Sequence, residues 1–169
     1  MMYVDIAGAV RAAKLFAEFN WTWTMSDIPK LCSLAGWLIS DADEGGAIIA
    51  TDLDVRRPEA IAFEAQQSFA YWGRPEQEVQ GISVRVGDRP AAEAPNDLLT
   101  RQHYTSLHTE LSTALGGLDE GRAGTNPPFT IWHGRNVIIE LAMAPGLIKL
   151  DATNPTYRWM VDQESDSAD

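Results

Sequence analysis

The stretch that decides the fold is residues 129–151, FTIWHGRNVIIELAMAPGLIKLD. It contains three short runs rich in β-forming residues, at 129–133, 137–143 and 147–151. The runs are separated only by His-Gly-Arg-Asn and Ala-Pro-Gly, which are typical turn sequences. Because such short connections join neighbouring strands of opposite direction, we predict an antiparallel meander of three strands.

Two regions earlier in the chain extend this pattern. Residues 37–40 and 47–53 are mostly apolar and flank the polar, glycine-bearing stretch 41–46, which predicts a β-hairpin. In residues 81–87, Ile and Val alternate with small or charged side chains, which is typical of a strand with one face in water. The chain therefore supplies more strands than the meander alone.

The N-terminal part predicts two helices. Residues 6–19 carry apolar side chains at spacings of three and four, and Asp5 is well placed to cap their N-terminus. A second, shorter helix is predicted over 26–36, from a Ser-Asp-Ile-Pro start to a glycine. Between them, Trp21 and Trp23 alternate with threonines, so we expect both indoles to point to the same side and to fill the gap between the helices.

A run that opens at Pro58 is less easily assigned. Ile61, Ala65, Phe69 and Trp72 stand at helical spacing, which favours a third helix. The start of the same run, Ala-Ile-Ala-Phe, also fits an extended strand. We expect the helix and keep the strand as the alternative.

The second half of the chain predicts the longest helix over 96–115, capped by an asparagine and preceded by a Pro- and Ala-rich loop at 90–95. The Gly- and Pro-rich residues 116–128 are expected to form a mobile loop. A last short helix is predicted over 154–161, and the charged residues 162–169 are expected to be a disordered acidic tail.

This order of elements predicts an α+β fold. A chain of 169 residues suffices for one hydrophobic core, so we expect a single domain over residues 1–161. We predict a two-layer sandwich with a mostly antiparallel sheet of about six strands and helices on one face. Strands and helices do not alternate at the spacing of βαβ units, which disfavours a Rossmann-like fold.

Composition excludes several classes of partner. The chain has 24 acidic and 13 basic residues, a formal net charge of −11, which argues against nucleic acid and anionic membranes. A single cysteine, Cys32, cannot form an internal disulfide, and no signal-peptide pattern or long apolar window is present. We therefore expect a cytoplasmic protein.

The acidic hairpin is the most tempting metal site. Residues 41–52 place carboxylates at positions 1, 3 and 12 and a glycine at position 6 of a calcium loop. However, position 5 is Gly45, which has no ligand, position 12 is Asp52 instead of glutamate, and the flanks are predicted strands rather than helices. A solvated hairpin turn is the better interpretation, and no metal is expected.

Catalytic motifs are also missing. His103 and His108 are five residues apart, so they diverge around the predicted helix, and His133 lies elsewhere in the chain. Nucleophile-elbow, Walker A and dinucleotide-binding sequences do not occur, and Cys32 is expected to be a buried, inert thiol. We therefore expect a protein that is not an enzyme and holds no cofactor.

Aromatic and acidic residues instead suggest a protein-binding surface. Six tryptophans are many for this length, and most of them are expected to fill the core. Trp, Tyr and Arg near loop ends are, however, typical of interface hot spots. The candidate partner-binding residues are Asp41, Asp43, Glu44, Trp72 and Arg74.

Several short segments together resemble a family of actinobacterial proteins of unknown function. These segments are Phe19–Thr24, Ile28–Pro29, Ala35–Trp37, Arg57–Ala60, Leu150–Asp151 and Asn154–Tyr157, followed by a terminal tryptophan. Small acidic members of such families are often encoded beside secreted toxins. The functional analogue is the immunity factor that neutralises the tuberculosis necrotizing toxin, an NAD-glycohydrolase. The resemblance implies an immunity protein that covers the active site of a cognate toxin, and it assigns no contact residue.

Two other functions stay open at this point. A secretion chaperone is also small, acidic and α+β, and it would form a dimer with an exposed apolar groove. A small hydrolase or ligand-binding domain would need a deep pocket with polar groups converging around one of the three histidines. An immunity protein would instead bind a folded enzyme with nanomolar or tighter affinity.

Overall fold

The computed structural model describes residues 1–90 and 97–167. In this part of the chain the helices are α1 (Ile6–Glu18), α2 (Asp27–Ala35), α3 (Asp97–Ala114) and α4 (Pro155–Ser167), with a short 3₁₀ helix η1 (Phe69–Trp72). The strands are β1 (Tyr3–Val4), β2 (Leu38–Asp43), β3 (Gly46–Ala50), β4 (Glu59–Glu64), β5 (Val79–Asp88), β6 (Asp119–Thr125), β7 (Pro128–His133), β8 (Ile138–Ala144) and β9 (Leu147–Thr153).

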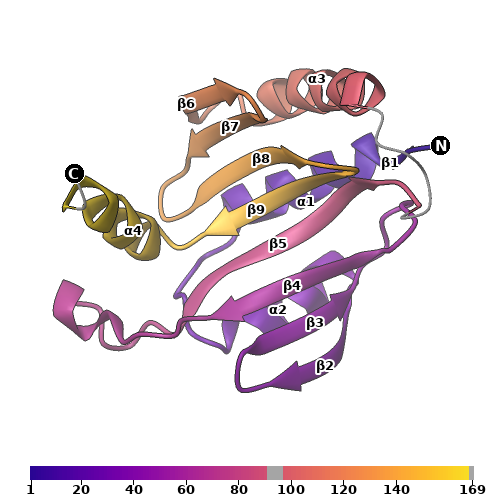
Figure 1. Ribbon diagram of the computed structural model, residues 1–169. Coiled ribbons are helices and arrows are strands. Elements are labelled where there is room, and N and C mark those ends of the chain that lie inside the picture. Colours follow the sequence, from indigo (N-terminus) through magenta and orange to yellow (C-terminus); the bar gives the residue numbers. More distant parts are fainter. Residues whose placement is uncertain (91–96, 168–169) are drawn as a thin grey trace.

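All nine strands join one antiparallel sheet of two similar halves (Figure 1). The order is β2-β3-β4-β5-β9-β8-β7-β6, and β1 adds to one end of β5. Each half has one or two helices followed by a meander of four strands: α1 and α2 precede β2 to β5, and α3 precedes β6 to β9. The last strands of the two meanders, β5 and β9, pair at the centre of the sheet.

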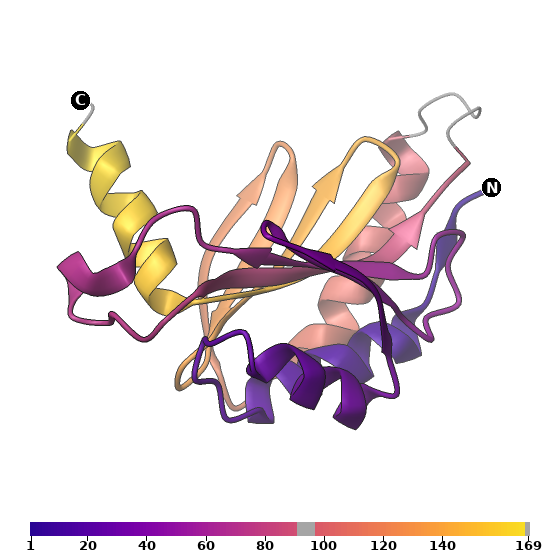
Figure 2. The same cartoon turned by 90° about the horizontal axis from the view of Figure 1, so that it is seen from below.

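Three helices cover one face of the sheet, which we call the covered face (Figures 1 and 2). α1 packs against α3 and against the central strands, and α2 lies against β2. The apolar side chains of the strands on this face are buried, and many of them have exposed fractions of 0–1%. They include Ile49, Ile82, Val84, Ile139, Leu141, Ile148 and Leu150.

The segment between α1 and α2 ties the two halves together. Trp21 and Trp23 are buried and stack with ring centroids 4.2 Å apart, which confirms that both indoles point to one side. The Trp23 indole donates to the carbonyl of Asn136 in the β7–β8 turn, and the Asn136 amide donates to the carbonyl of Trp21. Trp23 has a positive φ of 60°, a costly conformation for a bulky residue, so several contacts must hold it in place.

Asp27, at the start of α2, provides much of that support. Its carboxylate is 1% exposed and accepts hydrogen bonds from the backbone N–H groups of Thr22 and Trp23 and from the Thr22 hydroxyl, at 2.7–2.9 Å. The buried charge is therefore well satisfied, as buried carboxylates must be. This is a structural role for an acidic residue that the sequence marked only as part of a helix start.

Many of the predicted elements are confirmed. The two N-terminal helices, the 37–53 hairpin, the 81–87 strand, the 129–151 meander and the long helix all form. Asp5 accepts a hydrogen bond from the Gly8 N–H as predicted, and Gly36 ends α2 with a φ of 74°. The loop at 90–95 falls mainly outside the described residues, and so does the predicted cap Asn96.

Four predictions were wrong in detail. The sheet has nine strands instead of about six. Residues 59–64 form β4 and only 69–72 are helical, because β4 pairs on both sides with β3 and β5 and tertiary pairing overrides the helical spacing. Residues 119–125, expected in a mobile loop, form the edge strand β6. The last helix continues to Ser167, so residues 162–167 are helical where we expected a disordered tail.

Within the described residues, the helices are all too short or too polar to cross a membrane.

Candidate functional site

The face of the sheet opposite α1, α2 and α3 is the candidate functional site, and we call it the open face. Figure 2 shows the three helices on one side of the sheet, whereas α4 stands on the other side at one end. Every second residue of each strand points to the open face, because side chains alternate along a strand. The open face therefore carries the residues that lie between the core positions.

The first half of the open face is apolar. Ile48, Ile61 and Phe63, which we call the apolar strip, are 43%, 38% and 40% exposed. Ile48 and Ile61 are direct cross-strand neighbours, and all three line a groove of about 310 Å³. Asp41 and Asp43, on the adjacent β2, line the same groove, so the apolar strip has an acidic border.

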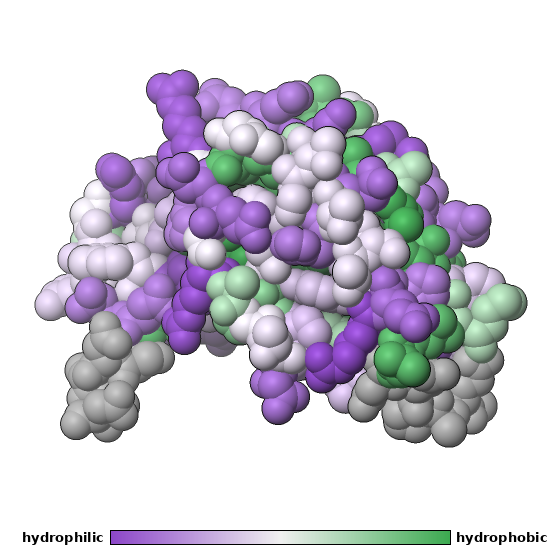
Figure 3. Space-filling model, turned by 90° about the horizontal axis from the view of Figure 1, so that it is seen from above, coloured by the Kyte–Doolittle hydropathy of each residue, from purple (hydrophilic) through white to green (hydrophobic). Residues whose placement is uncertain are grey.

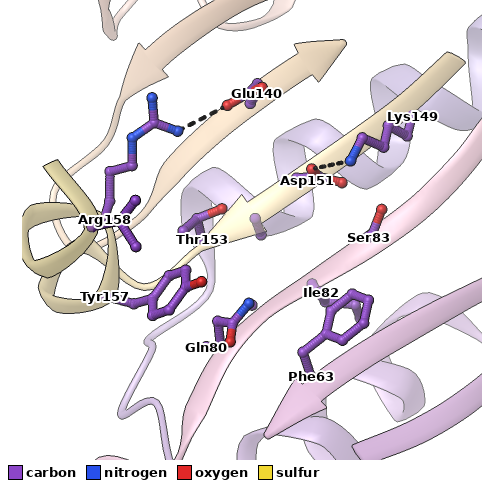
Figure 4. A pocket seen from close by; sticks show the side chains of 13 residues that line it. Phe63, Gln80, Ile82, Ser83, Glu140, Lys149, Asp151, Thr153, Tyr157 and Arg158 are labelled. Atoms are coloured by element: carbon purple, nitrogen blue, oxygen red, sulfur yellow. Dashed lines mark hydrogen bonds and ion pairs between the residues drawn. The ribbon is translucent and has the colours of Figure 1, made fainter. Parts of the chain in front are cut away.

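The second half of the open face is charged and contains the central pocket, a cavity of about 400 Å³ (Figure 4). Phe63 lines both this pocket and the neighbouring groove, so the two hollows adjoin at this side chain. Figure 4 shows Glu140 and Arg158 at one side of the pocket and Phe63 at the other. The polar side chains that line it are Gln80, Ser83, Glu140, Lys149, Asp151, Thr153, Tyr157 and Arg158.

Two ion pairs line the pocket. Arg158 of α4 lies 3.1 Å from Glu140 of β8, and Lys149 lies 3.5 Å from Asp151 on β9. Arg158 also contacts Asp162, one turn further along α4, at 3.5 Å. Asp162 lies outside the pocket, whose own lining holds two carboxylates, Glu140 and Asp151, and two cations, Lys149 and Arg158, so these charges balance.

The register places like charges side by side. Glu140 is the direct cross-strand neighbour of Asp151, and Lys149 is the neighbour of Arg85. Directly opposed like charges destabilise a sheet. The cationic pair is relieved in part by Glu59, which lies 3.4 Å from Arg85.

Burial leaves the two acids of the pocket poorly solvated. Burial raises the pKa of Glu140, and the nearby Asp151 raises it further, while Arg158 lowers it. Burial likewise raises the pKa of Asp151, although Ser83 and Lys149 oppose the shift. The buried Oδ1 atom of Asp151 has no hydrogen-bond partner among the described residues. These carboxylates therefore lack part of the stabilisation that a carboxylate fully exposed to water receives.

An aromatic cluster stands at the end of the sheet where α4 begins. Trp72 of η1 and Trp159 of α4 meet edge to face with ring centroids 4.4 Å apart, and Tyr71 packs on Trp72 at 4.8 Å. Tyr71 is 86% exposed and Trp159 is 49% exposed. This cluster extends the open face with a wall of residues that are common in protein interfaces.

The five candidate residues from the sequence fall into two groups. Asp41, Asp43 and Glu44 are exposed on β2 and its turn, beside the apolar strip. Trp72 and Arg74 belong to the segment around η1, where Trp72 is partly buried against Trp159 and Arg74 is exposed.

A third hollow, of about 420 Å³, lies between α3 and the β6–β7 edge. Figure 3 shows this edge as mostly hydrophilic or neutral, with hydrophobic residues in small separate areas. His108 there contacts both Glu120, at 3.3 Å, and Ser112, at 3.4 Å. Both contacts use the same ring nitrogen, Nε2, whereas a catalytic triad needs one partner on each nitrogen. This geometry does not match nucleophilic catalysis.

The remaining motifs have structural roles. Asp52 accepts a hydrogen bond from the Trp37 indole at 2.9 Å. Burial raises the pKa of the Cys32 thiol, which makes it a poor nucleophile. In the described ranges, no group of three or more His, Cys, Asp and Glu side chains is arranged to hold a metal ion.

Sequence reasoning missed the central pocket, although one signal could have found it. The Pro145-Gly146 turn leaves Ala144 opposite Leu147, and counting outward from that pair sets Glu140 opposite Asp151. Two acids facing each other in the middle of a sheet carry a cost. Such a pair calls for an explanation other than stability.

Comparison with known proteins places the chain in a family. No curated protein and no solved structure is significantly similar to it. A family model, described as a family of unknown function, DUF6301, matches residues 7–154. The match spans most of the chain, including strands β2 to β9, and ends just before α4. The chain therefore belongs to the family of unknown function DUF6301.

Proposed function

We propose that this protein is a cytoplasmic immunity protein, which binds a cognate secreted toxin and neutralises it by covering the toxin's active site. The candidate toxin class is an NAD-glycohydrolase, by analogy with the immunity factor named above. The protein acts through binding alone, so no catalytic group is needed on its side.

The observation that carries the proposal is the open face itself. One side of the sheet is covered by three helices, whereas the other exposes the apolar strip, the central pocket and the aromatic cluster side by side. Exposed apolar side chains next to charged and aromatic ones are the usual composition of a protein-binding surface. A rigid sheet presents such a surface with little loss of conformational entropy on binding.

The net charge supports a basic partner. At −11, the protein attracts a positively charged toxin over a distance, which speeds encounter. The acidic border of the apolar strip, Asp41 and Asp43, puts some of that charge on the open face. Fast capture matters for an immunity protein because the toxin must be blocked before it acts.

Co-expression tests the proposal. A candidate toxin encoded beside the gene is produced in a host cell with and without this protein, and survival is counted. We expect survival only with the protein, and a complex that persists through size-exclusion chromatography. Equal killing in both cultures, together with no complex, contradicts the proposal.

A secretion chaperone is the second candidate, and the apolar strip is the observation that favours it. Three exposed apolar side chains in a groove could also hold an unfolded client. A chaperone of this kind is expected to be a dimer and to bind the client only when that client is unfolded. Light scattering of the free protein and binding to folded against denatured toxin separate the two functions.

A further inference from the structure

The central pocket has chemistry that the proposed function does not yet use. It holds two partly buried carboxylates, two cations already paired with them, and two aromatic rings, Phe63 and Tyr157. A surface that only excluded water would not need two opposed acids at its centre. We therefore asked which group of a partner these residues would receive.

The carboxylates have binding capacity left. Glu140 is 21% exposed, and the ion pair with Arg158 uses only one of its oxygens, Oε2. Arg158 is in turn shared with Asp162, so Glu140 does not have that cation to itself. Asp151 stands directly across the strand pair, and its Oδ1 is buried without a hydrogen-bond partner. The Asp151 side chain is 20% exposed and its Oδ2 pairs with Lys149 at 3.5 Å, so its partly buried charge is screened less than a surface charge but is not free of a partner cation.

The walls of the pocket favour a planar cation. Phe63 and Tyr157 both line the cavity, and a guanidinium group stacks on aromatic rings better than an ammonium group does. A guanidinium also carries several N–H donors, which suit a carboxylate together with the Thr153 and Tyr157 hydroxyls on the same walls. Arginine is moreover one of the residues that dominate interface hot spots.

From these observations we infer that the central pocket receives an arginine side chain of the protein partner, with Glu140 as its hydrogen-bond acceptor and Asp151 as the second negative charge. This inference rests on the proposed function for the existence of the partner. It adds the chemical group by which that partner is recognised.

A small probe tests the pocket without any partner. Ethylguanidinium, which mimics the end of an arginine side chain, is titrated into the ¹⁵N-labelled protein and followed by NMR. We expect saturable, millimolar binding that shifts the amide signals of β8, β9 and the start of α4. Ethylammonium should bind more weakly, and propionate should leave these signals in place.

Variants make the result specific. Glu140→Gln is expected to weaken ethylguanidinium binding about five-fold or more, because a charge-assisted hydrogen bond becomes a neutral one. Asp151→Asn is a second variant with the same expected direction. Glu110→Gln is the matched control, since it removes the same charge from an exposed position on α3, far from the open face, and should leave binding nearly unchanged. Thermal unfolding of each variant verifies that it is folded.

Several outcomes would overturn the inference. These are the absence of saturable ethylguanidinium binding, tighter binding of propionate than of ethylguanidinium, and equal loss of binding in Glu110→Gln and Glu140→Gln. The inference and the proposed function fail separately. If the toxin is neutralised but Glu140→Gln neutralises it as well as the wild type does, the arginine pocket is wrong and the immunity function stands. If the pocket binds the probe but no toxin is neutralised, the immunity function is wrong.

Discussion

The covered face and the open face are made by alternating residues of the same strands, yet they treat polar groups in opposite ways. On the covered side, the buried carboxylate of Asp27 accepts three hydrogen bonds from Thr22 and Trp23. On the open face, the Oδ1 atom of Asp151 is buried with no hydrogen-bond partner in the described part of the chain, and Glu140 faces Asp151 across the strand pair.

This difference separates stability from binding. A fully satisfied buried charge, together with strands whose apolar side chains are buried, is what a stable core requires. Opposed like charges and exposed apolar side chains weaken a fold, and a protein keeps them where they contribute to something else. The contrast teaches that the open face is the part of the sheet that was not built for stability alone.

The largest expected effect comes from the covered face. Leu150 is completely buried at the centre of the sheet, so Leu150→Ala should lower the free energy of unfolding by about 2–5 kcal/mol. Urea denaturation measures the change. A loss below about 1 kcal/mol would mean that the covered face is not the tightly packed core described above.

Asp27 gives the next largest effect. Asp27→Ala leaves two backbone N–H groups without an acceptor and removes the support of the positive φ at Trp23, so we expect a loss of about 3 kcal/mol. Denaturation followed by tryptophan fluorescence reports it, because Trp21 and Trp23 are stacked beside this site. Asp54→Ala, at an exposed carboxylate, is the control and should change stability little.

The charge of Asp151 is expected to cost stability, whereas the carboxylate of Asp27 supports the fold through its hydrogen bonds. Because burial raises the folded pKa of Asp151 above its ordinary 3.8, its protonated form is more favoured in the fold than in the unfolded chain. The stability that this contributes is fully present below that ordinary pKa and is lost as the pH rises through the raised value. As the pH rises from acid to neutral, the unfolding free energy of the wild type should therefore fall relative to that of Asp151→Asn. Urea denaturation at several pH values measures it, and a difference that grows in favour of the wild type would contradict the assignment.

The smallest effect on stability is expected at the aromatic cluster. Trp159 is half exposed and its ring packs against that of Trp72, so Trp159→Ala should lower the free energy of unfolding by about 1 kcal/mol. Thermal unfolding measures the shift. A much larger loss would show that α4 is part of the core rather than a wall of the open face.

The sequence predicts the covered face better than the open face. The alternation Ile82, Val84, Val86 and the apolar spacing of α1 follow from local pattern, and they predicted the covered face well. β4 was only the alternative to a helix and β6 was missed, because neighbouring strands, which local sequence does not reveal, determine their pairing.

The site was harder to predict for the same reason. The acidic residues of β2 were recognised because they stand together in the sequence. The central pocket combines residues from β5, β8, β9 and α4, such as Ser83, Glu140, Asp151 and Arg158, which only the sheet register and the placement of α4 bring together.

One measurement tests the central claim, that the open face is the surface that neutralises the toxin. Ile61 on the open face and Leu34 on α2 are both exposed apolar residues, at 38% and 68%, on opposite sides of the sheet. Ile61→Asp and Leu34→Asp are each co-expressed with the candidate toxin, and survival is compared with the wild type. We predict that Ile61→Asp fails to protect the cells while Leu34→Asp protects them fully. Loss of protection with Leu34→Asp but not with Ile61→Asp would contradict the account.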